Sequence, residues 1–560
     1  MHANRDARSP LRGHSPGTGS DRISRAAIGG LLAVALGLRL LGLGQDALWL
    51  DEANTWAIAR EPLGGIVQRL QQDASPPLYY FFLHGWMAWF GESAWVLRLP
   101  SVLAGVALVA LTFHVGRSFF SQRAGFVAAW LVAVSPSQIF HSQEARMYSW
   151  LGWLALLATW RLVRALSVTA TPPPHGRSEE VRAWAFYALA LAAALLTHNF
   201  AFHLVPAHAC IVLASARPAR GLAAFAAAGL LTLALYAPWL PVFLGQLRGV
   251  DTYSWYADVW ATTGPLKALL RSLDSISPFG QYFAATKVPP VRWLQVIAGA
   301  VLLLSGIGAR VEGRRARSAV RFPVTIAFAL PVLTSIALSV WLTPHFVPGR
   351  VDQMMLAPLM LLVGAGFESV CPRGKGGGVL AIAAALITLG AGLYLRPVDE
   401  ADLARRASAK GSALGTEAAV FESLMDRARP GDLLICTSLA RAPLVHLLHL
   451  RGMALRVESF PASTAEHLGG QDDRLLLEDR PALAREAEAV VDRALGFLSD
   501  EAPSARRVHL VLMESEVNRI LGDRFEAAEL AGRIVPSHLP AGFIQRAVHQ
   551  FGTLRSYVRE

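Results

Sequence analysis

The stretch Ile28–Trp56, IGGLLAVALGLRLLGLGQDALWLDEANTW, joins a membrane-length apolar segment to an acidic pair. A helix that crosses a bilayer needs roughly 20 mainly apolar residues, so residues 28–44 form a candidate span. Asp51 and Glu52 follow almost directly. Because carboxylates beside a membrane are costly to desolvate, such a pair indicates a functional site. The stretch predicts an α-helical polytopic membrane protein with chemistry at one membrane surface.

The composition of the chain supports the membrane class. Of its 560 residues, 53% are hydrophobic and only 17% are charged, with a mean hydropathy of +0.38. These values exclude an ordinary soluble enzyme. The net charge is +11, but the arginines stand in short clusters between apolar segments, so we expect no nucleic-acid partner. The three cysteines are scattered without metal-ligand or redox spacing, and we expect no disulfide framework.

The N-terminal residues 1–27 are polar and rich in arginine, and they predict a cytoplasmic tail. The apolar run behind them contains Arg39 and has no obvious small-residue cleavage site. We therefore interpret the first span as a retained anchor and not as a removed signal peptide.

Hydropathy predicts about 11 membrane spans, and the apolar stretch 183–215 is the weakest point of that count. It fits one long helix or two short helices broken at Thr197-His198-Asn199, and two helices keep the later arginine clusters inside. The predicted spans lie near residues 28–44, 95–115, 124–140, 147–166, 183–197, 200–215, 220–243, 291–309, 322–342, 351–370 and 378–395.

The arginine clusters between alternate spans predict the topology, because cytoplasmic loops carry an excess of positive charge. They place several polar residues outside the cytoplasm, in line with one extracytoplasmic site in the plasma (inner) membrane. These residues are Asp51, Glu52, His141, Glu144, Arg146, His198, the loop 244–290 and Arg350.

Beyond residue 395 the composition changes and charged residues become frequent. Apolar runs at 432–438, 455–460 and 508–513 alternate with helical patterns near 415–428, 441–451, 483–498 and 515–532. We expect three parts: the tail 1–27, a transmembrane domain 28–395, and a small extracytoplasmic α/β domain 396–560. The last part shows no Gly-rich phosphate loop.

Asp51 is the candidate base for transfer of a sugar from a phosphate leaving group, a reaction that needs a base, a phosphate holder and exclusion of water. Glu52 could orient Asp51, strengthen it as a base through like-charge proximity, or help to hold a divalent cation. The alternative is that both carboxylates cap a helix or are solvated, because acidic residues favour helix starts. The sequence establishes no cofactor, and dependence on a divalent cation stays open.

The segment His141–Tyr148, HSQEARMY, places an acid, a cation and a phenol within about two helical turns: Glu144, Arg146 and Tyr148. The guanidinium is suited to grip a phosphate. The alternative is a local salt bridge that anchors a helix end at the membrane interface.

His198 interrupts the stretch 183–215, with His203 and His208 following at intervals of five. That spacing does not stack the three rings on one helical face, so we expect no metal site made from them alone. His198 is a candidate phosphate contact, and the alternative is a histidine satisfied at the membrane interface.

Arg350 ends the segment Thr343–Arg350, TPHFVPGR, on the outer side, where the positive-inside tendency disfavours a cation. It is a candidate lipid-phosphate contact, with snorkelling to the headgroup level as the alternative. Arg39 admits the same two interpretations, with snorkelling favoured. The many aromatic residues of the loop 244–290 are interpreted as an interfacial belt.

The order of motifs along the chain resembles the bacterial branch of the dolichyl-phosphate-mannose protein mannosyltransferase family. These are GT-C fold enzymes, related also to the lipid A aminoarabinose transferases. The resemblance covers roughly residues 28–395 and is strongest from Leu48 to Trp150. It rests on Leu50-Asp-Glu-Ala53, Ser75-Pro-Pro-Leu-Tyr-Tyr80, Phe90-Gly-Glu92, Leu97-Arg-Leu-Pro-Ser101, Ser135-Pro136, Ser142-Gln-Glu-Ala-Arg-Met-Tyr148, Thr197-His198 and Pro348-Gly-Arg350.

The resemblance implies a polyprenyl-phosphate-linked sugar donor and an inverting transfer on the extracytoplasmic side. It also implies a catalytic aspartate in the first outer loop, which matches Asp51, and a second-loop acid, which matches Glu144. Family members often have tyrosine after the late arginine, whereas this chain has Val351.

The expected acceptor is a hydroxyl of a cell-envelope glycan, of a lipid such as lipopolysaccharide, or of a protein. A transporter or flippase of lipid-linked sugars is the main alternative, and a membrane scaffold without catalysis is a third. Because the polar residues gather at the outer ends of the spans, the sequence favours an enzyme.

Overall fold

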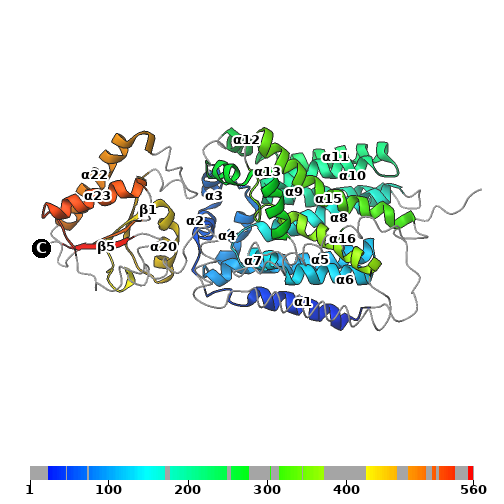
Figure 1. Cartoon of the computed structure of the whole chain (residues 1–560), viewed down its shortest axis with the longest axis horizontal. Coiled ribbons are helices and arrows are strands. Elements are labelled where there is room, and N and C mark those ends of the chain that lie inside the picture. Colours follow the sequence, from blue (N-terminus) through cyan, green and yellow to red (C-terminus); the bar gives the residue numbers. More distant parts are fainter. Residues whose placement is uncertain are drawn as a thin grey trace, which may run out of the picture.

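The computed structural model describes residues 23–45, 47–71, 73, 75–170, 177–248, 254–276, 303, 315–342, 345–370, 424–462, 477–499, 507–512, 516–536 and 553–558. Within these residues, 6 helices are long and apolar enough to cross a membrane, or up to 7 if one bent pair is a single span. They make the chain a multi-pass α-helical membrane protein (Figure 1). These helices are α5 (Ala94–Phe119), α8 (Tyr148–Ala170), α9 (Arg177–Thr197), α11 (Pro218–Tyr236), α15 (Arg315–Trp341) and α16 (Gln353–Val370).

The predicted span 124–140 coincides with a bent pair of helices. The structure has α6 (Gln122–Val134) and α7 (Pro136–Ser142), bent by 59°. Pro136 has no amide hydrogen to donate to the carbonyl of Val132, so the helix breaks at Ser135. The predicted spans 291–309, Leu303 apart, and 378–395 lie outside the described residues.

Arg39, on α1 (Arg25–Leu40), bonds to the carbonyls at this break. Its Nη2 donates to the carbonyl of Val132 at 3.2 Å, and its Nη1 donates to that of Ala133 at 3.0 Å. The side chain is fully buried, so the favoured interpretation of Arg39 as a snorkelling residue is wrong. A buried guanidinium needs acceptors, and a broken helix supplies them.

Replacing Arg39 with methionine is expected to lower the free energy of unfolding by about 1–3 kcal/mol, because buried carbonyls lose their donor. Thermal unfolding in detergent measures the change. The matched control is Leu36→Met, on the exposed side of the same helix. Equal melting temperatures for the two variants would contradict this role of Arg39.

The stretch 183–215 is two helical segments, as the arginine clusters indicated. Helix α9 ends at Thr197, and a 3-10 turn, η1 (Asn199–His203), leads into α10 (Leu204–Leu213). The backbone of His198 is extended, and its Nδ1 accepts a hydrogen bond from the amide of Phe200 at 3.0 Å. Two further elements follow α11: α12 (Leu240–Arg248), and α13 (Ser254–Ile276), which is interrupted at Gly264.

Three short helices connect α1 to α5: α2 (Leu50–Ala59), α3 (Leu63–Leu70) and α4 (Leu78–Phe90). They lie at the end of the helical bundle that faces the C-terminal part of the chain (Figure 1). Helices α5, α6 and α16 pack closely in the bundle, because a Cβ atom on Gly116 would stand 2.4 Å from the Cα atom of Gly125. The closely packed helices of the bundle therefore support the short helices α2, α3 and α4.

The described residues from 424 onward form what we call the α/β unit. Its five-stranded sheet has the order β2-β1-β3-β5-β4, in which β1 (Leu433–Thr437) pairs in parallel with β2 (Arg456–Phe460) and β3 (Arg507–Leu512). The strands β5 (Thr553–Val558) and β4 (Val535–Pro536) complete it in antiparallel fashion. The three apolar runs predicted as strands are thus β1, β2 and β3.

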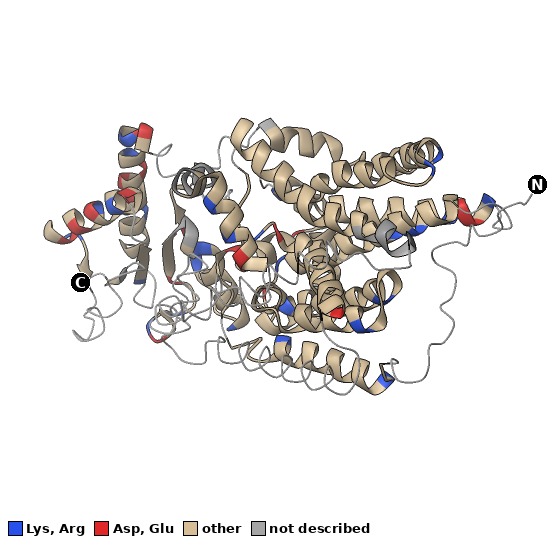
Figure 2. Ribbon diagram, turned by 45° about the vertical axis from the view of Figure 1, so that its right-hand side comes forward, with Lys and Arg blue, Asp and Glu red and all other residues tan. Residues whose placement is uncertain are grey.

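The helices of the α/β unit pack on the sheet through two apolar clusters. One joins α22 (Arg480–Ser499) and α23 (Glu516–Leu530) to the sheet, and the other joins α20 (Ser438–Leu450) to it. Charged residues gather on the α/β unit and near the ends of the bundle helices, whose middles are almost free of them (Figure 2). The predicted domain boundary near residue 396 lies outside the described residues.

Candidate active site

Glu52 forms hydrogen bonds that connect three segments of the chain next to the site. It lies at the third position of α2, where its carboxylate accepts the amide of Trp49 at 3.3 Å. Arg98 of α5 donates to both carboxylate oxygens at 2.7 Å, and the amide of Ala145 donates at 2.8 Å. Glu52 is fully buried. Sequence reasoning assigned it to catalysis, but these contacts fit a positioning residue, because both oxygens are engaged by protein donors.

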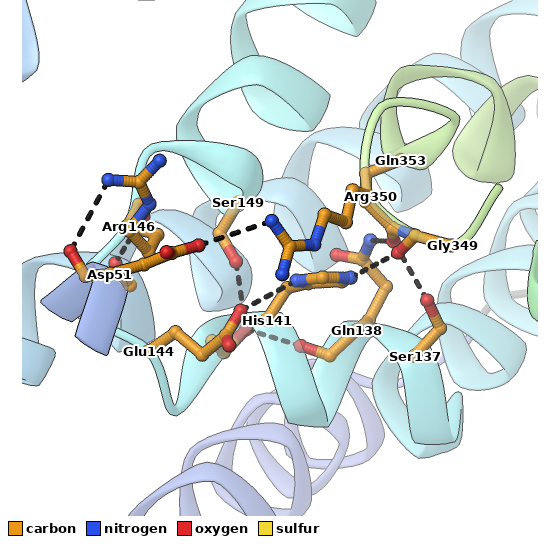
Figure 3. A network of polar contacts seen from close by, with 12 residues as sticks. Asp51, Ser137, Gln138, His141, Glu144, Arg146, Ser149, Gly349, Arg350 and Gln353 are labelled. Carbon is orange, nitrogen blue, oxygen red and sulfur yellow. Dashed lines mark hydrogen bonds and ion pairs between the residues drawn. The ribbon is translucent and has the colours of Figure 1, made fainter. Parts of the chain in front are cut away.

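The side chain of Asp51, the residue next to Glu52, lies in a more exposed environment. Its side chain is 21% exposed, and its Oδ2 accepts from Nη1 of Arg350 at 3.2 Å. Figure 3 shows Arg350 reaching toward Asp51 from the turn that precedes α16. Two segments almost 300 residues apart in the sequence therefore meet at one carboxylate that solvent or a substrate can reach.

Arg146 lies on the other side of Asp51. Its Nη1 donates to the hydroxyl of Thr55 at 2.9 Å and to the backbone carbonyl of Asp51 at 3.4 Å. Its Nε is buried without a hydrogen-bond partner among the described residues. The guanidinium stands 5.8 Å from the ring centre of Tyr148. A half-buried cation with a spare donor is suited to an anionic ligand.

Tyr148 lies between two histidine rings at the start of α8. Its ring centre is 5.0 Å from that of His141 and 5.9 Å from that of His198. Burial, with a smaller effect of Arg146, lowers the pKa of His198 to about 3, so the ring is neutral at neutral pH. Because Nδ1 accepts from Phe200, the ring proton is on Nε2, which is free to act as a donor.

Glu144 is buried and contacts His141 of α7, with 2.9 Å between Oε2 and Nδ1. The other nitrogen of His141 donates to the carbonyl of Gly349 at 2.6 Å. A hydrogen bond therefore joins Nδ1 of His141 to Oε2 of Glu144. The pair holds the turn that carries Arg350 and places a second acid beside it.

The turn of Arg350 is fixed by buried residues that sequence reasoning missed. Gly349 adopts a φ of +88°, which favours glycine, and its amide donates to Asp352 at 2.9 Å. Asp352 also accepts from two serines of α13, and Gln353 bonds to the carbonyl of Gly349 and to two residues of α7. The partners of this network are Ser272, Ser275, Ser137 and Gln138. The sequence feature that could have identified these residues is the presence of polar residues within predicted membrane spans.

The structure brings together Asp51, Glu144, Arg146, Tyr148, His198 and Arg350. The two other histidines lie elsewhere: His203 stacks on His345, and His208 contacts Tyr187 and Thr159. In the described ranges, no group of three or more His, Cys, Asp and Glu side chains is arranged to hold a metal ion. In the aromatic loop 244–290, Trp260 is half-buried and packs against the main apolar cluster.

Residues 74–241 match the family described as dolichyl-phosphate-mannose-protein mannosyltransferase. The structure is similar to ArnT from Cupriavidus metallidurans bound to undecaprenyl phosphate, with a TM-score of 0.53, 14% identity and coverage of 96% of this chain and 98% of ArnT. The apo state of the same ArnT gives a TM-score of 0.51, 14% identity and coverage of 95% and 98%. No curated protein matches the chain.

At this identity, the likeness to ArnT shows the fold, which is the GT-C fold expected from the motifs. The family match covers less than half of the chain and adds a regional likeness to a mannosyltransferase family to this shared fold.

Proposed function

We propose that the protein transfers a sugar from a polyprenyl-phosphate-linked donor to a hydroxyl of a cell-envelope acceptor, with inversion, on the extracytoplasmic face. One observation supports this most directly: a partly exposed carboxylate, Asp51, is paired with Arg350 beside the half-buried side chain of Arg146. A base and two cations thus share one site. Transfer of a sugar from a lipid phosphate requires the same set.

The donor phosphate would bind between Arg146 and Arg350. The buried Nε of Arg146 supplies a donor that no described protein group uses, and the neutral ring of His198 supplies another through Nε2. Binding of undecaprenyl phosphate by the ArnT of similar fold is consistent with this placement. The aromatic ring of Tyr148 lies against both His198 and Arg146 and would keep them in place.

Asp51 would act as the base once the donor is bound. The phosphate competes with Asp51 for Arg350, which releases the carboxylate to accept a proton. The acceptor oxygen then loses its proton to Asp51 and attacks the anomeric carbon, while the bond from that carbon to the phosphate oxygen breaks. Its electron pair stays on the lipid phosphate, which the arginines stabilise. A single displacement inverts the anomeric centre, as in other glycosyl transfers.

The distribution of arginines supports the proposed sidedness of the site. The arginine clusters between alternate spans put the segments of Asp51, Glu144, His198 and Arg350 together outside the cytoplasm. We propose that the α/β unit lies on that side as well, because α20 contacts α2 next to the site. The membrane would be the plasma (inner) membrane.

Undecaprenyl phosphate is expected to bind the wild type and to bind Arg146→Gln or Arg350→Gln about 10- to 100-fold more weakly. Loss of a hydrogen bond to a charged group costs about 1.5–3 kcal/mol, which corresponds to that range. Binding in nanodiscs is measured with undecaprenol as the uncharged comparison. Arg25→Gln, at the exposed start of α1, is the control. Unchanged binding in both site variants would contradict a phosphate site here.

A further inference from the structure

The α/β unit contacts the bundle at helix α2, which also carries Asp51 (Figure 1). Trp56 of α2 is buried against two histidines of α20. Its ring centre lies 4.8 Å from that of His446, in an edge-on arrangement, and 5.8 Å from that of His449. The indole Nε1 donates to Oε2 of Glu92 at 2.6 Å.

Glu92, between α4 and α5, connects all partners of this contact. Its carboxylate accepts from Nε2 of His449 at 3.1 Å and lies 3.6 Å from Nε of Arg60. Its backbone carbonyl accepts from Nε2 of His446 at 3.0 Å. Arg60 follows α2 directly, donates to Nδ1 of His449 at 3.2 Å and lies 5.2 Å above the Trp56 ring. We call Trp56, Arg60, Glu92, His446 and His449 the clamp.

The hydrogen bonds define the role of one or both ring nitrogens in each histidine of the clamp. Nδ1 of His449 accepts from Arg60, so the ring proton is on Nε2, which faces Glu92. Nε2 of His446 donates to a carbonyl, and its Nδ1 is buried without a partner among the described residues. Burial lowers the pKa of His446, although the carbonyl and carboxylate of Glu92 oppose the shift. In the clamp, His446 therefore holds the backbone of Glu92, and His449 holds its carboxylate.

Helix α2 is only 10 residues long, with Asp51 in its first turn and the clamp at its end. A helix of this length is marginal in isolation, so its orientation depends on the groups that hold it. Glu52 and Arg98 fix its beginning, and Trp56 and Arg60 fix its end. An error of 1 Å in the placement of a catalytic group can cost about 100-fold in rate.

We propose that the α/β unit positions the base of the active site: His446 and His449 hold the end of α2 and thereby set the placement of Asp51. This inference rests on the proposed function of Asp51. It makes the histidines positioning residues, which touch neither the donor nor the reacting atoms. It also gives the α/β unit a role in transfer that the fold alone does not require.

The test compares the wild type with His446→Ala/His449→Ala in proteoliposomes. We expect kcat to fall about 10- to 100-fold, while KM for the donor stays within about twofold, because Arg146 and Arg350 are not part of the clamp. Hydrogen exchange of the α2 amides should become faster, with exchange in α8 and α16 unchanged. His446→Gln, which keeps a donor at the position of Nε2, should restore much of the rate when His449 is intact.

Arg493→Ala is the matched control, because Arg493 lies on α22 of the same unit and pairs only with Glu458 in the described structure. If the double variant does not fold, His449→Ala alone serves, because that side chain is 36% exposed. Normal kcat with unchanged exchange of α2 would overturn the inference. If the wild type transferred no sugar, the proposed function would fail, and the exchange of α2 would still decide whether the clamp holds the helix.

Discussion

Asp51→Asn is expected to lower the rate of sugar transfer by about 10²–10⁴-fold, the range that a positioned general base contributes. The amide has the shape of the carboxylate, and its oxygen can still accept from Arg350, 3.2 Å away in the wild type. It cannot take the acceptor proton. The loss should therefore appear in kcat, with donor binding preserved, in single-turnover transfer from a polyprenyl-phosphate sugar.

The matched control for this prediction is Glu61→Gln. Glu61 is a carboxylate just beyond α2, exposed and paired with Arg69, and we assign it no part in the site. Its variant should transfer sugar at the wild-type rate. A folded Asp51→Asn protein that worked as fast as the control would show that the Asp51–Arg350 pair is structural and that another group is the base.

Replacing Arg98 with alanine is expected to lower the free energy of unfolding by about 3–5 kcal/mol, because it leaves Glu52 as an unpaired buried charge. Arg98 and Glu52 are almost completely buried and joined at 2.7 Å. Arg98 also donates to the carbonyls of Leu43 and Ala47, so the loop before α2 loses its anchor as well. Thermal unfolding in detergent measures the effect.

An exposed pair provides the comparison for Arg98. Arg524 and Glu488 lie 2.9 Å apart on the surface of the α/β unit, where both side chains are roughly half exposed. Exposed pairs contribute about 0–1 kcal/mol, so Arg524→Ala should change stability little. Equal effects of the two substitutions would mean that the Glu52–Arg98 pair does not hold the site together.

Apolar periodicity and arginine clusters were sufficient to predict which segments meet at the site. Asp51, Glu144, His198 and Arg350 all follow or precede spans on the same side, and the structure places them together. The break at His198 was also visible, because polar residues interrupt an apolar stretch there. These features depend on local sequence and on the alternation of successive connecting segments between the two sides of the membrane.

The division of roles between Asp51 and Glu52 was not predictable. Adjacent residues on a helix point about 100° apart. One of the pair therefore faces the open site and the other faces Arg98, which the sequence places 46 residues away. The burial of Arg39 had a similar cause, since two of its acceptors are carbonyls at the break between α6 and α7, 93 and 94 residues away.

Contacts between segments that are distant in the sequence account for the other features that could not be predicted. The clamp joins residues 56, 60, 92, 446 and 449, and no spacing in the sequence relates them. The network around Asp352 depends on serines of α13, which lies in a loop interpreted from the sequence only as an aromatic belt. Such pairings follow from the packing of the whole chain.

The most direct test of the central claim is transfer by the purified wild type in proteoliposomes, with a panel of polyprenyl-phosphate sugars and envelope acceptors. The anomeric configuration of the product is determined by NMR. We predict transfer from at least one donor, with the configuration opposite to that of the donor. A protein that binds these donors and transfers none, or a product that retains the donor configuration, would contradict an inverting transferase with Asp51 as its base.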